Sequence, residues 1–349
     1  MPKAYRAEFF DNDLNLLAWA EIGSNPIAFD YIALEGTTIQ TKKTLGNVST
    51  LNLCRIVSED GQRYAGIVDA VTSDAISTTI TIKPMLTLLD VTCYFDRTKL
   101  HSVSLERFIA DILESLYAGS DALQNFTGFR TVTTSKTTNA KLNLKDNVHN
   151  LYDILTTALK KYGVVIAMDF DPAKKVVEAT VGVVKDKRWF IEADLPGCMD
   201  VNVNFSDGLD GMNKLTLVNK RDESQKAVYY LHPDGKVDTR NTDRITPVKF
   251  GYEYIDEDDF PSGAEEKAFD ALKPQKYDNL IELTVRADNL LVRWKDHTIG
   301  EPATIWYKGG CYKSVFTGWT DREESATLTF GAVRLELTKK LILERRRND

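Results

Sequence analysis

Two patterns of hydrophobic and polar positions divide the chain into three regions. Over residues 1–98, and again from about residue 196, apolar and polar residues alternate in short runs. This period of two is typical of strands with one face in a core. Between these regions, apolar residues recur with the spacing of an amphipathic helix. The pattern predicts a mainly β protein with an α+β insertion.

The first region is predicted to be a run of strands separated by polar turns. Pro84 is expected to end the last strand, because proline has no N–H to donate to a ladder. The predicted strands are residues 5–10, 29–34, 37–41, 49–57, 64–71 and 78–82.

The middle region opens with a clear helical stripe. Apolar residues from Leu105 to Tyr117 fall at i, i+3, i+4, i+7, i+8, i+11 and i+12, which places them on one helix face. Ser104 is a suitable N-cap, and Gly119 is predicted to be the left-handed residue just past the helix end.

A second helix is predicted over residues 151–162, with Asn147 as its cap and Gly163 as its end. Residues 164–170 and 176–184 then read as a hairpin around a Pro-containing turn. The middle region is therefore predicted to place two helices on a small antiparallel sheet.

The last region returns to strands, which the sequence assigns to one closing barrel. An insertion near residues 240–278 interrupts it and contains a short acidic helix, 264–272, that ends before Pro274. The predicted strands are residues 201–205, 214–219, 227–231, 236–239 and 279–286, followed by those of the repeat described next.

A segment near the start of the chain recurs near its end at a constant offset. Residues 61–68 reappear as residues 309–316, so that Tyr64 corresponds to Tyr312 at an offset of 248 positions. The same offset superposes Val71 on Trp319 and two alternating Thr-rich strands on each other. The repeat predicts two related β-domains with other material between them.

These observations predict a domain organisation with a basic tail. The predicted units are residues 1–98 (first β-barrel), 99–195 (α+β middle domain), 196–340 (second β-barrel with the insertion) and 341–349 (tail).

Composition restricts the classes of function. The net charge of −7 argues against a protein that grips nucleic acid by its phosphates. The four cysteines lack CxxC spacing and are expected to be buried reduced thiols. No run of about 18 apolar residues and no secretory signal is present, which predicts synthesis in a cytoplasm without a membrane anchor.

The sequence offers no candidate catalytic, cofactor-binding or metal-binding residue, and it predicts that the protein is not an enzyme. The four histidines lie in different segments without HxxxH or HExxH spacing, and His149 is expected on a helix facing solvent. The acidic run 256–259 lacks the Gly and Glu of an EF-hand loop, and residues 207–211 read as a turn. The five tryptophans are scattered, and packing is their expected role.

The repeat and the middle region carry a family resemblance. They resemble bacteriophage tail-hub (baseplate hub) proteins along most of the chain. The residues that carry this resemblance are 66–69 and 84–90 in the first region, 151–155 and 162–166 in the middle, and 299–307, 309–318, 328–331, Arg334 and 337–338 near the end.

The resemblance implies two tail-tube-like barrels, a helix–sheet middle domain and a homotrimer. Three copies would offer six similar barrels, joining a six-fold tail tube to a three-fold tip and leaving a channel for DNA. The implied partners are the distal tail or tube protein above, a spike, fibre or lysin protein below, and DNA that passes without specific binding. The implied location is the virion. Some relatives continue into a hydrolase or fibre domain, so any such activity is expected from a partner protein.

Two other interpretations remain open from the sequence. A carbohydrate-binding or adhesin-like β-protein would be a monomer with exposed aromatic residues, for which Trp294, Trp306 and Trp319 are the candidates. A glycan hydrolase would need a pair of carboxylates that sequence alone cannot identify, because such pairs form in space.

Overall fold

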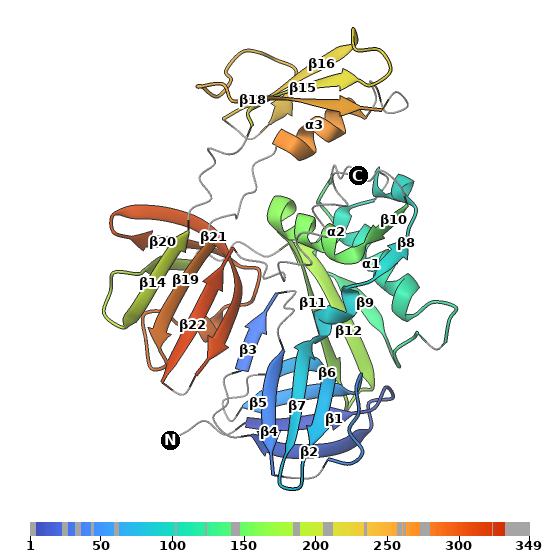
Figure 1. Cartoon of the computed structure of the whole chain (residues 1–349), viewed down its shortest axis with the longest axis vertical. Helices are drawn as coiled ribbons and strands as arrows, with labels where there is room; N and C mark the ends of the chain where they lie inside the picture. Colours follow the sequence, from blue (N-terminus) through green and yellow to red (C-terminus); the bar gives the residue numbers. More distant parts are fainter. Residues whose placement is uncertain are drawn as a thin grey trace.

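Five β-sheets and three α-helices form the described part of the chain (Figure 1). The computed structural model describes residues 5–22, 27–31, 36–42, 45–58, 63–101, 103–122, 124–140, 147–183, 189–204, 212–233, 236–256, 260, 263–272, 280–322 and 324–331.

The first sheet has six strands and curls so that its end strands β2 and β4 approach each other. Alternate side chains of its strands point into an apolar core, as in β4, where Ile39 is fully buried between exposed neighbours. The strands in spatial order are β2 (Leu16–Ile22), β1 (Tyr5–Phe10), β5 (Leu53–Ser58), β6 (Arg63–Ser73), β7 (Thr78–Pro84) and β4 (Thr37–Thr41).

The second sheet has seven strands. Six of them follow one another in the spatial order given below, and the seventh comes from the first region. This seventh strand is β3 (Ile27–Asp30), which pairs with β21. The other strands in spatial order are β13 (Trp189–Glu192), β20 (Pro302–Tyr307), β21 (Gly310–Asp321), β22 (Ser325–Phe330), β19 (Leu280–Arg286) and β14 (Cys198–Asn204).

The two sheets repeat the same four-strand unit, as the sequence predicts. The order β5-β6-β7-β4 in the first sheet matches β20-β21-β22-β19 in the second, and every neighbouring pair is antiparallel in both. Tyr64 lies opposite Ile56, and Tyr312 lies opposite Ile305. The two tyrosines therefore occupy equivalent register positions, and the predicted repeat is confirmed.

A β-bulge at the same place marks both copies. In the first sheet the ladder between β6 and β7 shifts register around Asp69, and in the second the ladder between β21 and β22 shifts around Thr317. These two residues are separated by the same 248 positions as Tyr64 and Tyr312. A bulge adds a local bend and twist to its strand, so both sheets curl at equivalent points.

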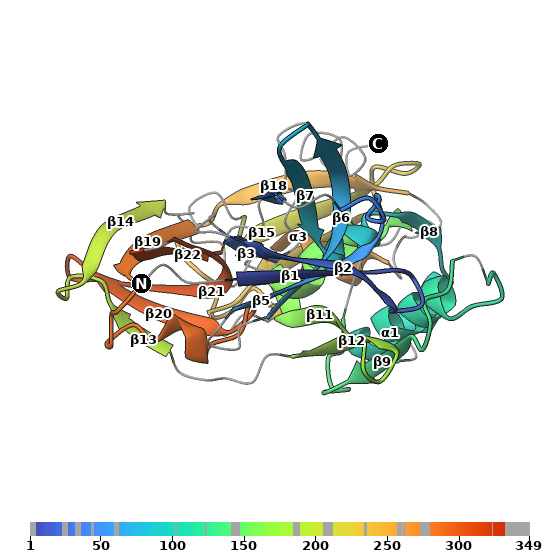
Figure 2. The ribbon, with the colours of Figure 1, turned by 90° about the horizontal axis from the view of Figure 1, so that it is seen from below.

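The middle unit packs two helices against a three-stranded sheet; it lies above the first sheet in Figure 1 and to the right of the second sheet in both Figure 1 and Figure 2, and its core includes Val315 of β21. Its elements are β8 (Thr92–Tyr94), α1 (Leu105–Tyr117), β9 (Arg130–Thr133), β10 (Val148–Asn150), α2 (Leu151–Thr157) with a π-helical turn (Ala158–Tyr162), β11 (Val164–Asp171) and β12 (Val176–Val183). The short strands β8 and β10 form a separate pair.

One hydrophobic core joins the middle unit to the first sheet. The connection runs through the 3₁₀ turn Met85–Leu89, which directly follows β7. The buried hydroxyl of Tyr152 donates to the carbonyl oxygen of Leu86 at 3.0 Å, and the hydroxyl of Tyr117 donates to that of Leu88 at 2.7 Å. The first sheet and the middle unit therefore share their packing and are expected to unfold together.

Several details of the middle unit differ from the sequence predictions. Ser104 caps α1 and Gly163 is left-handed, as predicted, but Gly119 does not have a positive φ; a Cβ there would collide with the carbonyl oxygen of Ser115. The cap of α2 is Asn150, whose side chain accepts from the Tyr152 N–H, because residues 148–150 form a strand.

The sheet of the middle unit is mixed rather than antiparallel. The hairpin of β11 and β12 is present as predicted, but β9 adds to β12 in parallel. A parallel neighbour requires a long connection, and here that connection is the segment containing α2 and β11.

The insertion in the last region is wider than predicted. The strands over residues 214–219 and 227–231, assigned above to the closing barrel, belong to a separate four-stranded sheet. Its order is β17 (Val237–Asp238), β16 (Lys226–Leu231), β15 (Lys214–Asn219) and β18 (Phe250–Ile255), and α3 (Ala264–Leu272) covers one face as predicted. Alternation shows that a strand has one buried face, but it does not show which sheet provides the neighbours.

The sequence missed some strands and misplaced others. It did not predict β2, β13 or β18, and the strand predicted over residues 49–57 begins only at Leu53, because residues 49–52 form a turn. The strand predicted over residues 29–34 is the shorter β3, and residues 32–35 lie outside the described part of the chain.

A buried carboxylate holds the segment after β9 against α1. Glu106 is fully buried in the first turn of α1, and it accepts from the hydroxyls of Ser135 at 2.9 Å and Thr138 at 2.8 Å. Burial alone would raise the pKa of Glu106, but these hydrogen bonds outweigh it and hold the pKa below its usual value.

We expect Glu106→Gln to lower the free energy of unfolding by about 1–3 kcal/mol near neutral pH, because the half-buried hydroxyls of Ser135 and Thr138 lose a charged acceptor. A lowered pKa favours the ionised group in the folded state, so its contribution is present above the unfolded pKa and is lost as pH falls through the folded pKa. The difference between wild type and variant should therefore shrink below a pH of about 4. Urea titrations of wild type and variant at neutral pH and below a pH of about 4 measure this difference in the free energy of unfolding. An equal difference at the two pH values would contradict the prediction.

Candidate functional site: the junction between the two repeated sheets

A short segment of the first region joins the two repeated sheets. We call residues 27–31 the arm. It contains β3, which runs antiparallel to the second half of β21, with Phe29 opposite Trp319 and Ile27 opposite Asp321. The arm leads directly toward β4 of the first sheet, so it connects both sheets through the backbone (Figure 1).

Aromatic rings fill the space between the sheets. The ring of Phe29 stacks on Trp319 with centroids 3.9 Å apart, and it meets the ring of Tyr64 edge-on at 4.6 Å. On its other side Trp319 contacts Trp294, with centroids at 4.4 Å. Such ring pairs stabilise a contact beyond the area they bury. The junction is therefore packed like a core.

Two hydrogen bonds fix the arm to other parts of the chain, and a third joins the two repeated sheets directly. The N–H of Tyr31 donates to the carbonyl oxygen of Thr317 at 2.7 Å, and its buried hydroxyl accepts from the N–H of Ile166 in β11 at 3.3 Å. Burial raises the pKa of this Tyr31 hydroxyl, which stays neutral. The hydroxyl of Tyr5 in β1 donates to Asp321 of β21 at 2.8 Å, and both side chains are buried.

This geometry suits a scaffold. Rings, backbone pairing and buried hydrogen bonds hold two similar curled sheets side by side in one orientation. Such a junction can fix the angle between the two sheets, because packed interfaces resist bending.

The histidines do not come together. His149 lies on strand β10, half-buried and stacked on Phe95 at 5.7 Å, so its predicted place on a solvent-facing helix is wrong. His232 is buried and contacts Asp238 at 2.9 Å, and His297 contacts Glu301 at 2.8 Å. His101 ends the 3₁₀ turn Arg97–His101. Each local contact stabilises its own unit.

Other sequence expectations have mixed outcomes. Within the described ranges, no three His, Cys, Asp or Glu side chains gather closely enough to hold a metal ion. No helix in those ranges has the length and hydropathy needed to cross a bilayer.

Cys54 and Cys93 are buried as predicted, but Cys198 is half-buried and Cys311 is exposed. Residues 207–211, 257–259 and 341–349 lie outside the described part of the chain.

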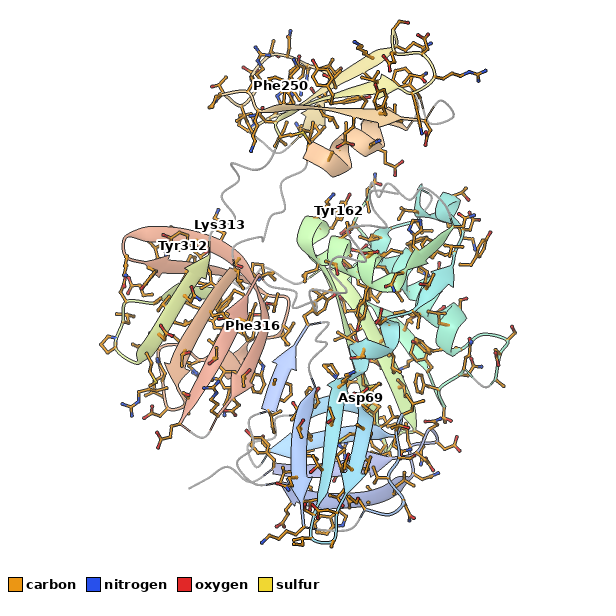
Figure 3. The ribbon with its side chains drawn as sticks, viewed as in Figure 1. Asp69, Tyr162, Phe250, Tyr312, Lys313 and Phe316 are labelled. Atoms are coloured by element: carbon orange, nitrogen blue, oxygen red, sulfur yellow. The ribbon has the colours of Figure 1, made fainter. Side chains whose placement is uncertain are left out.

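The tryptophan candidates for glycan binding are mostly buried. Trp294 is 3% exposed and Trp319 is 8% exposed, whereas Trp306 is 46% exposed. A row of exposed aromatic residues lies in the insertion, where Phe250 (labelled in Figure 3), Tyr252 and Tyr254 alternate along the edge strand β18. They form a row on the face opposite α3, because Leu215 and Leu217 pair with the intervening residues and contact the helix side.

Known structures share this fold. A chain of the phage P2 baseplate in its activated conformation matches with a TM-score of 0.55 and 13% identity, covering 96% of this chain and 100% of that one. A 43 kDa tail protein of prophage MuSo2 from Shewanella oneidensis matches with a TM-score of 0.55 and 12% identity over 94% and 98% of the two chains. A chain of the Francisella PdpA–VgrG complex matches with a TM-score of 0.52 and 9% identity over 95% and 58%.

The comparisons define the class of fold. No family model and no curated protein matches the sequence. The matches to solved structures nevertheless extend over almost the whole chain, and they confirm the resemblance inferred from the repeat and the middle region. This chain has the fold of phage baseplate and prophage tail proteins.

Proposed function

We propose that this chain is a structural protein of a phage or prophage tail tip. Three copies form a hub ring that joins the six-fold tail tube to the three-fold tip and leaves a channel for DNA. The observation that carries the proposal is the internal repeat, because two sheets share strand order, register and bulge position. Three such chains present six equivalent sheets, which reconciles the two symmetries.

The parts of the chain then take separate roles. The first sheet and the second sheet (residues 189–204 and 280–331, with β3) form the ring, the middle unit packs against the first sheet, and the four-stranded insertion is a surface for another tail protein. The tube or distal tail protein lies above the ring, and a spike, fibre or lysin lies below. The protein performs no chemistry and needs no cofactor. It is made in the host cytoplasm and ends in the virion.

The charge of the chain supports passage of DNA. With a net charge of −7, carboxylates outnumber cationic groups, and an acidic bore repels phosphates. DNA would then slide through the ring without binding.

The mass of the purified assembly tests the proposal. We expect a species of three times 39.3 kDa by light scattering or native mass spectrometry, and an annulus of six similar lobes in electron micrographs. Antibodies against the chain should label the tail tip of intact particles. A protein that stays monomeric after chemical cross-linking at high concentration, and that is missing from particles, would contradict the proposal.

The exposed aromatic row on β18 favours a second candidate, a carbohydrate-binding or adhesin-like protein. Phe250, Tyr252 and Tyr254 are each more than half exposed, and ring faces of this kind stack on sugars. A monomer that is retained on host cell-wall glycan, and that loses this retention in Tyr252→Ala, would favour this function over the ring.

A further inference from the structure

The four-stranded sheet of the insertion exposes one of its two faces. Helix α3 packs on the other face, against Leu215, Leu217 and Tyr229, and in Figure 1 it lies between this sheet and the rest of the chain. The face opposite α3, which we call the open face, is therefore turned away from the other units. Its side chains, in register across β18, β15 and β16, are Phe250, Lys214 and Tyr230, then Tyr252, Thr216 and Val228, then Tyr254, Val218 and Lys226.

A row of aromatic rings lines the open face. Phe250, Tyr252 and Tyr254 alternate along β18, and each is more than half exposed. The centroids of the Phe250 and Tyr252 rings are 6.3 Å apart. Tyr230 on β16 adds a fourth ring to the same face. Rings exposed in a row provide a stacking surface for flat groups.

Cationic side chains without an acidic partner lie beside these rings. The ammonium of Lys214 is 5.8 Å from the centroid of the Tyr230 ring, and the guanidinium of Arg244 is 5.7 Å from it. Lys226 is exposed on β16. In the part of the chain that the structure describes, none of these three cations forms an ion pair. Residues 212–256 carry eight Lys and Arg against seven Asp and Glu, whereas the whole chain carries 44 against 51.

Two acidic side chains near the open face are already engaged. Glu223 accepts from the hydroxyl of Tyr254 at 2.8 Å. Asp238 accepts from the guanidinium of Arg240 at 2.6 Å and contacts Nε2 of the buried His232 at 2.9 Å. The hydrogen bonds from Arg240, with that of His232, hold the pKa of Asp238 well below its usual value. The open face therefore attracts anions more than its sequence count of acids indicates.

This combination of groups distinguishes between classes of ligand. A sugar needs well-placed polar groups for its hydroxyls, and the acids near this face are occupied. Lysines are depleted at protein–protein interfaces. Exposed rings beside unpaired cations suit a single nucleic-acid strand, because its bases stack on rings while its phosphates meet cations. A four-stranded sheet with aromatic residues on one face is a known arrangement for stacking two or three bases.

We propose that the open face binds single-stranded DNA. Bases stack on the rings of β18, and the phosphates lie over the cations beside them. The choice of DNA over RNA rests on the proposed function, in which DNA reaches the tail tip, whereas the site itself does not depend on the ring. Duplex DNA hides its base faces, so this site does not hold the duplex that passes through the ring.

Binding of a fluorescent oligothymidylate of about ten nucleotides to the full-length protein tests the site. With three cations, the logarithm of the association constant should fall against the logarithm of salt concentration with a slope of about −2. The affinity should therefore drop about twentyfold between about 50 and about 200 mM salt. A duplex of the same length should bind about tenfold more weakly, because its bases cannot stack on the protein.

Single substitutions separate the rings from the cations. Tyr252→Ala should weaken binding about tenfold with an unchanged salt slope, because one base loses its stacking partner. Arg244→Ala should reduce the salt slope by about 0.7. The matched controls are Trp306→Ala and Arg322→Ala, which remove an exposed ring and an exposed arginine outside the insertion and should bind like wild type.

The outcomes of this experiment separate the site from the ring. Equal affinity for single strand and duplex, or unchanged binding in both Tyr252→Ala and Arg244→Ala, would overturn the inference. Tighter binding of oligouridylate, or of the anionic polysaccharide polygalacturonate, would overturn it as well and assign the open face to that ligand. A trimer found in particles that does not bind oligothymidylate at low salt overturns the inference alone, whereas a monomer that binds it overturns only the ring.

Discussion

Trp319→Ala should lower the free energy of unfolding by about 3–5 kcal/mol, the cost of removing a buried large aromatic side chain. The ring is 8% exposed, and it contacts both Phe29 of the arm and Trp294 of the second sheet. Alanine leaves a cavity between the repeated sheets that backbone pairing prevents from collapsing. The loss should appear in urea titrations followed by circular dichroism.

Hydrogen exchange would show where this loss acts. Amides of residues 27–31 should exchange faster in Trp319→Ala, because the arm loses its largest apolar contact. Trp306→Ala is the matched control: Trp306 is 46% exposed on β20, and its removal should change stability by less than about 0.5 kcal/mol. If the two variants had equal stability, the arm would not be held by its aromatic packing.

The elements that could be predicted from the sequence are those whose apolar spacing and end residues lie close together in the chain. Residues 105–117 form a helix because the apolar spacing, the Ser104 cap and the end of the stripe agree. The repeated strands were found for a similar reason, since alternation with large apolar residues recurs at one offset. β2 was missed because Leu16 and Trp19 are both exposed, which removes the alternation that marks a strand.

The junction could not be predicted, because its elements are short and its contacts are distant in sequence. The arm contributes only four strand residues, and its partner β21 lies far away in the sequence, with Trp319 290 positions after Phe29 (319 − 29). One signal was present. The repeat superposes Val71 on Trp319 and Asp69 on Thr317, and larger or less polar residues at equivalent places indicate that only the second copy is covered.

This asymmetry distinguishes the two copies of the duplicated unit. The β21 edge carries Trp319 and Thr317, which a permanently attached arm buries. The equivalent part of β6 carries Asp69, Thr72 and Ser73, which are exposed and polar.

Leu155→Ala should destabilise the protein by about 2–5 kcal/mol. The side chain is fully buried on α2, in the core that the middle unit shares with the first sheet. Because that core is continuous, both parts should melt at a lower temperature together, whereas the transition of the four-stranded insertion should not move, since it has its own core. Differential scanning calorimetry with Leu290→Ala as the control, a leucine that is 84% exposed, measures this. An unchanged melting curve for Leu155→Ala would show that this face of α2 is not packed in a core, and the shared core would then not be what fixes the middle unit to the first sheet.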